Sequence, residues 1–158
     1  MDRAPFIAVI GGGAAPSEIR ELAFEVGYQI ASHGAILICG GRGGVMESAA
    51  KGARELGGRT IGILPGYDPE SANRFIDLPI ATGVGEARNV IIIASADAVV
   101  ALAGEGGTLS EIGFALWLRR PVVALSSWPW VEGIHRAGSS AAAVGLALKL
   151  ARRRRRRR

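Results

Sequence analysis

One segment near the N-terminus decides the fold class: Phe6-Ile7-Ala8-Val9-Ile10, followed at once by Gly11-Gly12-Gly13. Five consecutive apolar residues without polar alternation are typical of a strand buried on both faces of a parallel sheet. The glycines end that strand and let the backbone approach a ligand closely. From Ser17 onward, apolar residues recur at intervals of three and four, which predicts an amphipathic helix with Ser17 as its N-cap. A buried strand that runs into such a helix indicates an α/β protein.

The same unit recurs along the chain. Further apolar strands are predicted at 35–39, 60–64, 98–101 and 122–125, and helices at 45–56, 86–95, 109–118 and from about residue 140. Residues 67–79 are rich in turn formers and are expected to form a surface loop, and Trp117 is expected to pack inside. Strands that alternate with helices predict a single-domain, Rossmann-like open parallel sheet with helices on both faces, spanning residues 1–151.

The net charge of +5 comes from one end of the chain. Arg152 to Arg158 are consecutive arginines, and the rest of the chain has 19 − 7 = 12 basic residues against 14 acidic ones, a balance of −2. The run contains no interleaved aromatic residues, so we expect a disordered tail over 152–158 and no specific binding of nucleic acid. The apolar segment Ala141–Leu150 is expected to pack on the sheet as a helix.

Several classes of protein are excluded by what the sequence lacks. The single cysteine, Cys39, cannot form an internal disulfide, and His33 and His135 are isolated, so no metal site is expected. No apolar run reaches the roughly 18 residues that a membrane span needs, because Asp97 interrupts the longest candidate. We therefore expect a cytoplasmic protein without a membrane span.

Three glycine-rich loops, at 11–13, 40–44 and 104–107, each follow a predicted strand. Ligands of open α/β sheets bind outside the carboxyl ends of the strands, and a helix that starts directly after such a loop offers unpaired N–H groups to a phosphate. The first loop does not match the dinucleotide fingerprint, because Pro16 occupies the last glycine position, and no P-loop is present. The three loops together predict a site for a phosphorylated small molecule.

The candidate residues follow from these loops. Those expected to bind the ligand are Gly12, Gly13, Gly41, Arg42, Gly44, Met46, Gly104, Gly106, Gly107 and Thr108. Glu111 lies one helical turn beyond Gly107, and Arg88 begins the helix that precedes the same loop region. Spacing and charge alone leave two interpretations for this pair. Glu111 and Arg88 are either site residues, or a helix-dipole partner and a surface cation.

Two motifs resemble those of a known family. Residues 104–111, G-E-G-G-T-L-S-E, resemble the P-G-G-x-G-T-x-x-E signature of the LOG proteins, which were long named lysine decarboxylases. Residues 40–46 resemble the glycine-rich G-G-x-x-G-x-M segment of that family, and the resemblance extends over roughly residues 6–126. It implies that Arg88 is the functional arginine of the family and Glu111 its signature glutamate.

The chain departs from this pattern at three positions. Ala103 replaces the signature proline, Glu105 replaces a glycine, and Asn89 stands where the LOG enzymes have a lysine. These departures and the short chain resemble the short branch of the superfamily, which includes molybdenum cofactor carrier proteins. The family also implies a homo-oligomer, a dimer or a tetramer.

The resemblance implies two possible functions. The first is hydrolysis of the N-glycosidic bond of AMP or a cytokinin riboside 5′-monophosphate to free base and ribose 5-phosphate, with no cofactor. Glu111 would stabilise the oxocarbenium-like sugar and orient water, while Arg88 would hold the phosphate or the sugar hydroxyls. The second is non-catalytic binding of the molybdenum cofactor, a pterin phosphate. A pyridoxal-dependent decarboxylase is not expected, because neither Lys51 nor Lys149 is placed to form a Schiff base.

Overall fold

The computed structural model describes residues 3–157 and contains one seven-stranded sheet in which every strand pairing is parallel. The strands are β1 (Phe6–Ile10), β2 (Ile36–Cys39), β3 (Thr60–Leu64), β4 (Leu78–Ala81), β5 (Ala98–Ala101), β6 (Val122–Leu125) and β7 (His135–Ala137). Their order across the sheet is β4-β3-β2-β1-β5-β6-β7. The structure confirms the predicted Rossmann-like α/β fold.

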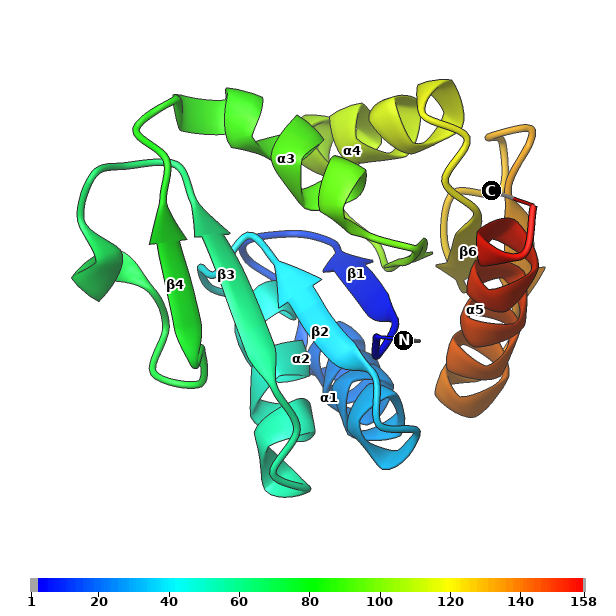
Figure 1. The fold of residues 1–158 in the computed structure, drawn as a ribbon, viewed down its shortest axis with the longest axis horizontal. Coiled ribbons are helices and arrows are strands. Elements are labelled where there is room, and N and C mark those ends of the chain that lie inside the picture. The colour runs from blue at the N-terminus through cyan, green and yellow to red at the C-terminus, as the bar shows by residue number, and fades with distance from the viewer. Residues whose placement is uncertain (1–2, 158) are drawn as a thin grey trace.

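Helices cover both faces of the sheet (Figure 1). α1 (Ser17–Ser32), α2 (Val45–Glu55) and α5 (Ser140–Arg155) pack on one face, and α3 (Arg88–Ser95) and α4 (Gly106–Trp117) pack on the other. Each face of the sheet has its own hydrophobic core, and successive residues of β1 point alternately into one and the other. Ile7 and Val9 pack toward the first set of helices, and Ala8 and Ile10 toward the second. This double burial explains why the strand reads as a continuous apolar run.

The order of the strands reverses at β1. The chain moves outward from β1 to β4 and then returns to place β5 on the opposite side of β1. The loops that follow β1 and β5 therefore leave the same end of the sheet in different directions, and a ligand crevice is expected between them. A hydrogen bond of 2.9 Å from the Gly12 N–H to the Ala103 carbonyl joins the two loops at their base.

Some local predictions are wrong. Residues 67–79 include the short 3-10 helix η1 (Pro69–Ser71) and lead into β4, an exposed edge strand with Pro79 in it. A proline is compatible with an edge strand, where one N–H need not pair. Ser17 is the first residue of α1 rather than its cap, and its side chain makes no capping bond. Trp117 ends α4 on the solvent side and is 77% exposed.

The C-terminal helix is longer than expected. As predicted, its apolar segment packs on the sheet, with Ala143, Val144 and Ala147 fully buried. The prediction of a disordered tail is wrong for Arg152 through Arg155, which continue α5. Arg158 lies outside the described residues. None of the helices within residues 3–157 combines the length and hydrophobicity that a bilayer crossing requires.

Candidate functional site

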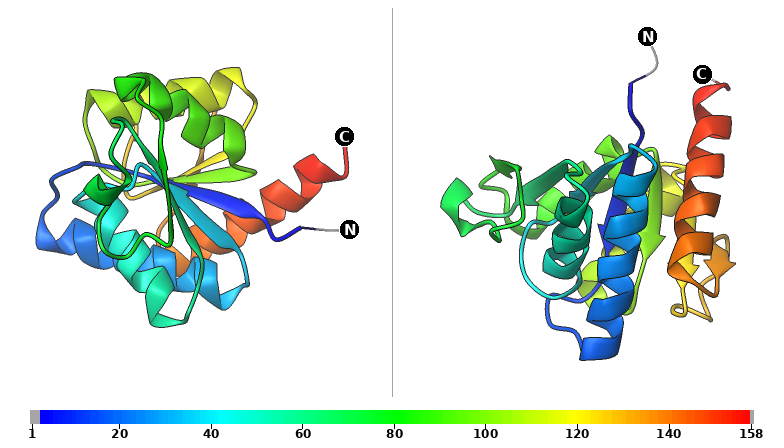
Figure 2. Two further views of the ribbon diagram at one scale, coloured as in Figure 1. Left: turned by 60° about the vertical axis from the view of Figure 1, so that its left-hand side comes forward. Right: turned by 90° about the horizontal axis from the view of Figure 1, so that it is seen from below.

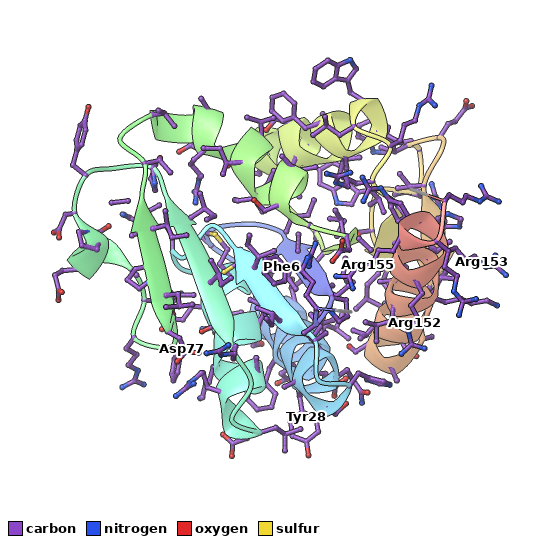
Figure 3. All side chains as sticks on the ribbon, viewed as in Figure 1. Phe6, Tyr28, Asp77, Arg152, Arg153 and Arg155 are labelled. Atoms are coloured by element: carbon purple, nitrogen blue, oxygen red, sulfur yellow. The ribbon has the colours of Figure 1, made fainter. Side chains whose placement is uncertain are left out.

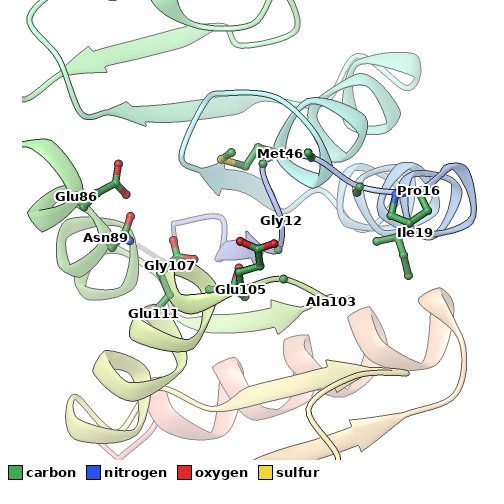
Figure 4. Close-up of a pocket in the computed structure, with 16 residues that line it drawn as sticks. Gly12, Pro16, Ile19, Met46, Glu86, Asn89, Ala103, Glu105, Gly107 and Glu111 are labelled. Atoms are coloured by element: carbon green, nitrogen blue, oxygen red, sulfur yellow. The ribbon is translucent and has the colours of Figure 1, made fainter.

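A cavity of about 550 Å³ lies at the point where the strand order reverses (Figure 4). It is lined by Gly11, Gly12, Gly13, Ala14, Ala15, Pro16, Ile19, Met46, Glu86, Asn89, Ala103, Gly104, Glu105, Gly107, Thr108 and Glu111. These residues come from the loop after β1, the loop after β5, and the starts of α1, α2, α3 and α4. Of the residues expected from the sequence, Gly12, Gly13, Met46, Gly104, Gly107, Thr108 and Glu111 line this cavity.

The start of α4 supplies the backbone donors of the site. The helix begins at Gly106, and Leu109 is the first residue whose N–H bonds back to a carbonyl, that of Glu105, at 2.9 Å. The amides of the first turn are therefore available, and two residues that carry them, Gly107 and Thr108, line the cavity. Gly104 makes this approach possible, because a Cβ at that position would overlap the Thr108 hydroxyl. The arrangement suits an anion.

The second glycine loop supports the cavity wall from behind. Gly44 has a φ of 63°, and a Cβ there would overlap the backbone of Gly12 and Gly13. The next amide, that of Val45, donates to the Gly12 carbonyl at 3.0 Å. Gly41, Arg42 and Gly44 do not line the cavity, and neither does Gly106. This loop lies at the end of the sheet that the sequence predicts. Gly41, Arg42 and Gly44, however, stand behind the cavity wall and do not line the cavity.

Arg88 is directed into the protein rather than into the cavity. Its side chain is buried, and its Nη1 donates to the carbonyl oxygens of Gly40 and Ile63. Within the described part of the chain its Nε has no hydrogen-bond partner. Burial lowers the pKa of the guanidinium, and the negative charges of Glu86 and Glu111 oppose that shift. Arg88 therefore joins the ends of β2 and β3 and does not line the cavity.

Glu111 lines the cavity and is only 8% exposed. Burial raises the pKa of its carboxyl group from an ordinary 4.5 to about 8. The positive charge of Arg88 acts in the opposite direction, and the negative charge of Glu86 adds to the increase. The side chain is consequently protonated at neutral pH. A protonated carboxyl both donates and accepts a hydrogen bond, which an ionised one does not do.

Sequence reasoning did not assign three polar side chains to the lining. Glu86 belongs to the 3-10 helix η2 (Gly85–Ala87), Asn89 to the first turn of α3, and Glu105 precedes α4. The Asn89 amide donates to the Ser110 hydroxyl at 3.3 Å. Glu86 could have been found from its position, two residues before Arg88 and at the ligand-binding end of the sheet. In the part of the chain that the structure describes, the lining has three glutamates and no lysine, arginine or histidine.

This donor set offers little for a resident metal. Within residues 3–157 no three His, Cys, Asp or Glu side chains are grouped so that they could hold a metal ion. Cys39 is fully buried beside the site, and burial raises the pKa of its thiol to about 12, so it is neutral there. The polar chemistry of the cavity is therefore that of backbone amides, one hydroxyl, one amide side chain and carboxyl groups.

Comparison with known proteins gives a consistent result. Residues 4–149 match the SLOG cluster4 family. The molybdenum cofactor binding protein of the phototrophic bacterium Rippkaea orientalis is 35% identical, with a TM-score of 0.87 over 94% of this chain and 98% of that one. The Moco carrier protein of Chlamydomonas reinhardtii is 39% identical, with a TM-score of 0.87 over 96% and 99%.

A relative with an enzymatic name is also similar. The cytokinin riboside 5′-monophosphate phosphoribohydrolase of Mycobacterium tuberculosis is 34% identical over 75% of this chain and 68% of its own length. The residues that match the family model include all those that line the cavity. The chain therefore belongs to the SLOG cluster4 family, within the LOG-like superfamily that also includes the molybdenum cofactor carriers.

Proposed function

We propose that this protein binds the molybdenum cofactor, a phosphorylated pterin, as a carrier that does not alter it. The cavity between the loops after β1 and β5 receives the ligand, and the cofactor is cargo rather than a resident group. The position of Arg88 carries this proposal, because its Nη1 is held by two backbone carbonyls and no cationic side chain among residues 3–157 lines the cavity. Such a site is better suited to holding a ligand than to cleaving one.

The phosphate of the ligand fits at the start of α4. The free amides at Gly107 and Thr108, the Thr108 hydroxyl and the positive end of the helix dipole attract an anion there. Glu105 lines the same part of the cavity and adds a negative charge beside these donors. The amides can compensate one phosphate group, and the carboxylate of Glu105 disfavours a second one. A monophosphate is therefore the expected ligand class.

The ring of the ligand fits the part of the lining formed by Glu86, Asn89 and Glu111. Glu86 and Asn89 lie together on one side of the cavity, with Pro16 and Ile19 across from them (Figure 4). A pterin presents amino and ring N–H donors next to a carbonyl acceptor. A carboxylate such as Glu86 accepts from those donors, and the protonated Glu111 donates to the acceptor. Glu111 and Asn89 are buried, so a ligand that left either of them unpaired would bind more weakly, which contributes to selectivity.

The hydrolase alternative has a specific observation in its favour. A carboxyl group with a pKa of about 8 can act as a general acid, and Glu111 could protonate the departing base of a nucleoside monophosphate. The relative from Mycobacterium tuberculosis carries the name of such an enzyme. However, the mechanism expected from the sequence required an ionised Glu111 and an Arg88 that holds the phosphate or the sugar hydroxyls. The carrier function needs neither.

The deciding experiment is an anaerobic titration of the purified chain with molybdenum cofactor, beside Thr108→Val. We expect saturable binding by the wild type and at least about tenfold weaker binding by the variant, because valine keeps the shape and removes the hydroxyl. Leu109→Ala, on the exposed side of the same helix turn, is the matched control and should bind normally. Absence of saturable binding by folded wild-type protein would contradict the proposal.

A parallel assay measures release of free base from AMP and from an isoprenoid adenosine monophosphate. We expect no turnover by the wild type. Turnover that disappears in Glu111→Gln would replace the carrier function with the hydrolase function and would assign Glu111 as its acid.

A further inference from the structure

A second concentration of charge lies around the end of α5, far from the cavity in the chain and in the fold. It borders two grooves, of about 340 Å³ and about 770 Å³. The first is lined by His33, Gly145, Leu148, Lys149, Arg152, Arg153 and Arg156, and the second by Leu116, Leu118, Arg119, Arg120, Pro121, Gly133, Leu150, Arg153, Arg154 and Arg157. Among residues 3–157, no acidic residue lines either groove. We call the basic residues of both grooves the arginine end.

Arg155 fixes this surface to the rest of the protein. Its guanidinium donates to Asp97 Oδ2 at 2.7 Å, to the Arg3 carbonyl at 2.7 Å and to the Ala4 carbonyl at 3.2 Å. Asp97 also accepts from the Phe6 N–H at 2.8 Å, so the last turn of α5 is tied to the start of β1. Figure 3 shows Arg155 turned toward Phe6 and Arg153 on the outer side of the helix. Helix ends normally fray, and these bonds hold this one in place.

The other arginines are presented on two sides of the fixed helix end. Arg152 and Arg156 line the groove next to the end of α1, while Arg157 lines the groove next to Arg119. Arg153 borders both grooves and joins them. Arg152, Arg153, Arg156 and Arg157 are exposed. The result is a continuous basic path around the end of the helix rather than a flat patch.

We propose that the arginine end binds single-stranded nucleic acid through its phosphate backbone, without preference for sequence. Guanidinium groups match phosphate oxygens in pairs, so a row of arginines fits a polymer of phosphates better than a single anion. A path that bends around a helix end requires a flexible polymer. Single strands can follow it, whereas duplex DNA is stiff over about 150 base pairs and cannot.

Other polyanions fit the arginine end less well. A membrane surface would meet arginines on one side of the helix only, and the apolar side chains of α5 that could insert into lipid, such as Val144 and Leu148, are buried in the core. Among the described residues no Phe, Tyr or Trp lines either groove, and His33 supplies the one aromatic ring, so bases have no row of stacking side chains there. The absence of stacking predicts binding that depends on the backbone and on salt.

The test is fluorescence anisotropy of a labelled oligo-dT of about 20 nucleotides with the full chain, between about 50 and 200 mM NaCl. Neutralising about five phosphates of a single strand gives a slope of log K against log salt near −3.5, or roughly a 100-fold loss of affinity over that range. The triple variant Arg152→Gln/Arg153→Gln/Arg156→Gln should bind at least about tenfold more weakly, with a slope smaller in magnitude by about 2.

A charge-matched control distinguishes the site from the net charge. Arg20, Lys51 and Arg74 line a separate groove beside Glu47, and their triple replacement by glutamine removes the same charge. That control should bind within about twofold of the wild type. Equal loss in both triple variants would overturn the proposal, as would absence of binding at the lowest salt. Tighter binding of a duplex, or of vesicles rich in anionic lipid, would also overturn it.

Discussion

The two ends of the sheet differ in how they present positive potential. At the ends of the strands, the cavity has glycine-rich loops, free amides of α4 and three glutamates, and none of the described basic residues is in its lining. At the starts of the strands, arginines surround the end of α5, and both chain termini lie there (Figure 2). Backbone amides have fixed positions and suit one small phosphate, whereas long arginine side chains adapt to many. The net charge of +5 therefore describes one end of the molecule only.

The largest expected effect concerns the cavity end and the buried carboxyl of Glu111. Because the pKa of Glu111 is raised from 4.5 to about 8, the folded state holds a proton that the unfolded state releases, and stability falls as pH rises between these values. Glu111→Gln removes the group that titrates and therefore this loss of stability. Between pH 5 and pH 9, the free energy of unfolding of the wild type should fall by about 4 kcal/mol relative to that of the variant. Urea unfolding at the two pH values measures the difference.

The control for this measurement is Glu25→Gln, at an exposed position on α1. The free energy of unfolding of Glu25→Gln should change between pH 5 and pH 9 by the same amount as that of the wild type. If the wild type and Glu111→Gln show the same pH dependence, Glu111 is ionised at neutral pH in the folded protein, and the cavity then has no neutral carboxyl donor and carries one more negative charge opposite the arginine end.

At the opposite end of the sheet, Asp97 should make the stability depend on pH in the opposite direction, with stability lost as the pH falls. Hydrogen bonds and ion pairs from Arg155, Phe6 and Arg3 lower the pKa of Asp97 against the opposing effect of burial. The ionised Asp97 therefore stabilises the fold at pH values above its ordinary pKa of about 4. This stabilisation is lost as the pH falls through the lower pKa that Asp97 has in the folded protein. Asp97→Ala leaves these donors unpaired and should cost about 3 kcal/mol at pH 7.

Arg3→Gln is the matched comparison, because the Arg3 side chain that pairs with Asp97 is 54% exposed. Removal of the Arg3 charge should lower the free energy of unfolding by less than about 1 kcal/mol. Thermal unfolding of Asp97→Ala and Arg3→Gln shows which substitution destabilises the protein more. Equal costs would mean that Arg155 does not anchor the helix end, and the fixed display of the other arginines would lose its basis.

The features that the sequence predicted correctly depend on local patterns. Apolar runs and the glycine loops that end them identified the buried strands and the end of the sheet that carries the cavity. Gly104, Gly107, Thr108 and Glu111 line it because a loop of this kind and the first turn of a helix place them there. The exposed strand β4 was missed, because a short edge strand with a proline has no apolar run to reveal it.

The features that the sequence did not predict depend on contacts between distant segments. Arg88 is held by the carbonyl of Gly40, directly after β2, and by that of Ile63 in β3, and no spacing rule indicates in which direction its side chain points. Arg155 is likewise ordered by Asp97, 58 residues away in the chain. A run of identical arginines looks uniform in sequence, yet Arg155 is structural, whereas Arg152, Arg153, Arg156 and Arg157 are exposed.

The smallest expected effect on stability comes from comparing Gly104 with Gly106, two glycines of the loop that leads into α4. A methyl group at Gly104 would overlap Thr108 and approach the Gly12 amide, whereas one at Gly106 would meet nothing within 4 Å. Gly104→Ala should therefore weaken binding of a monophosphate ligand by at least about tenfold, since the amides of α4 lose their approach to it. Gly106→Ala should keep affinity and gain about 0.5 kcal/mol of stability, because it restricts the unfolded chain. Titration and urea unfolding of the pair measure both quantities. Equal affinities would show that the phosphate does not sit at the start of α4, and the contrast between an end built on amides and an end built on arginines would then fail at the cavity.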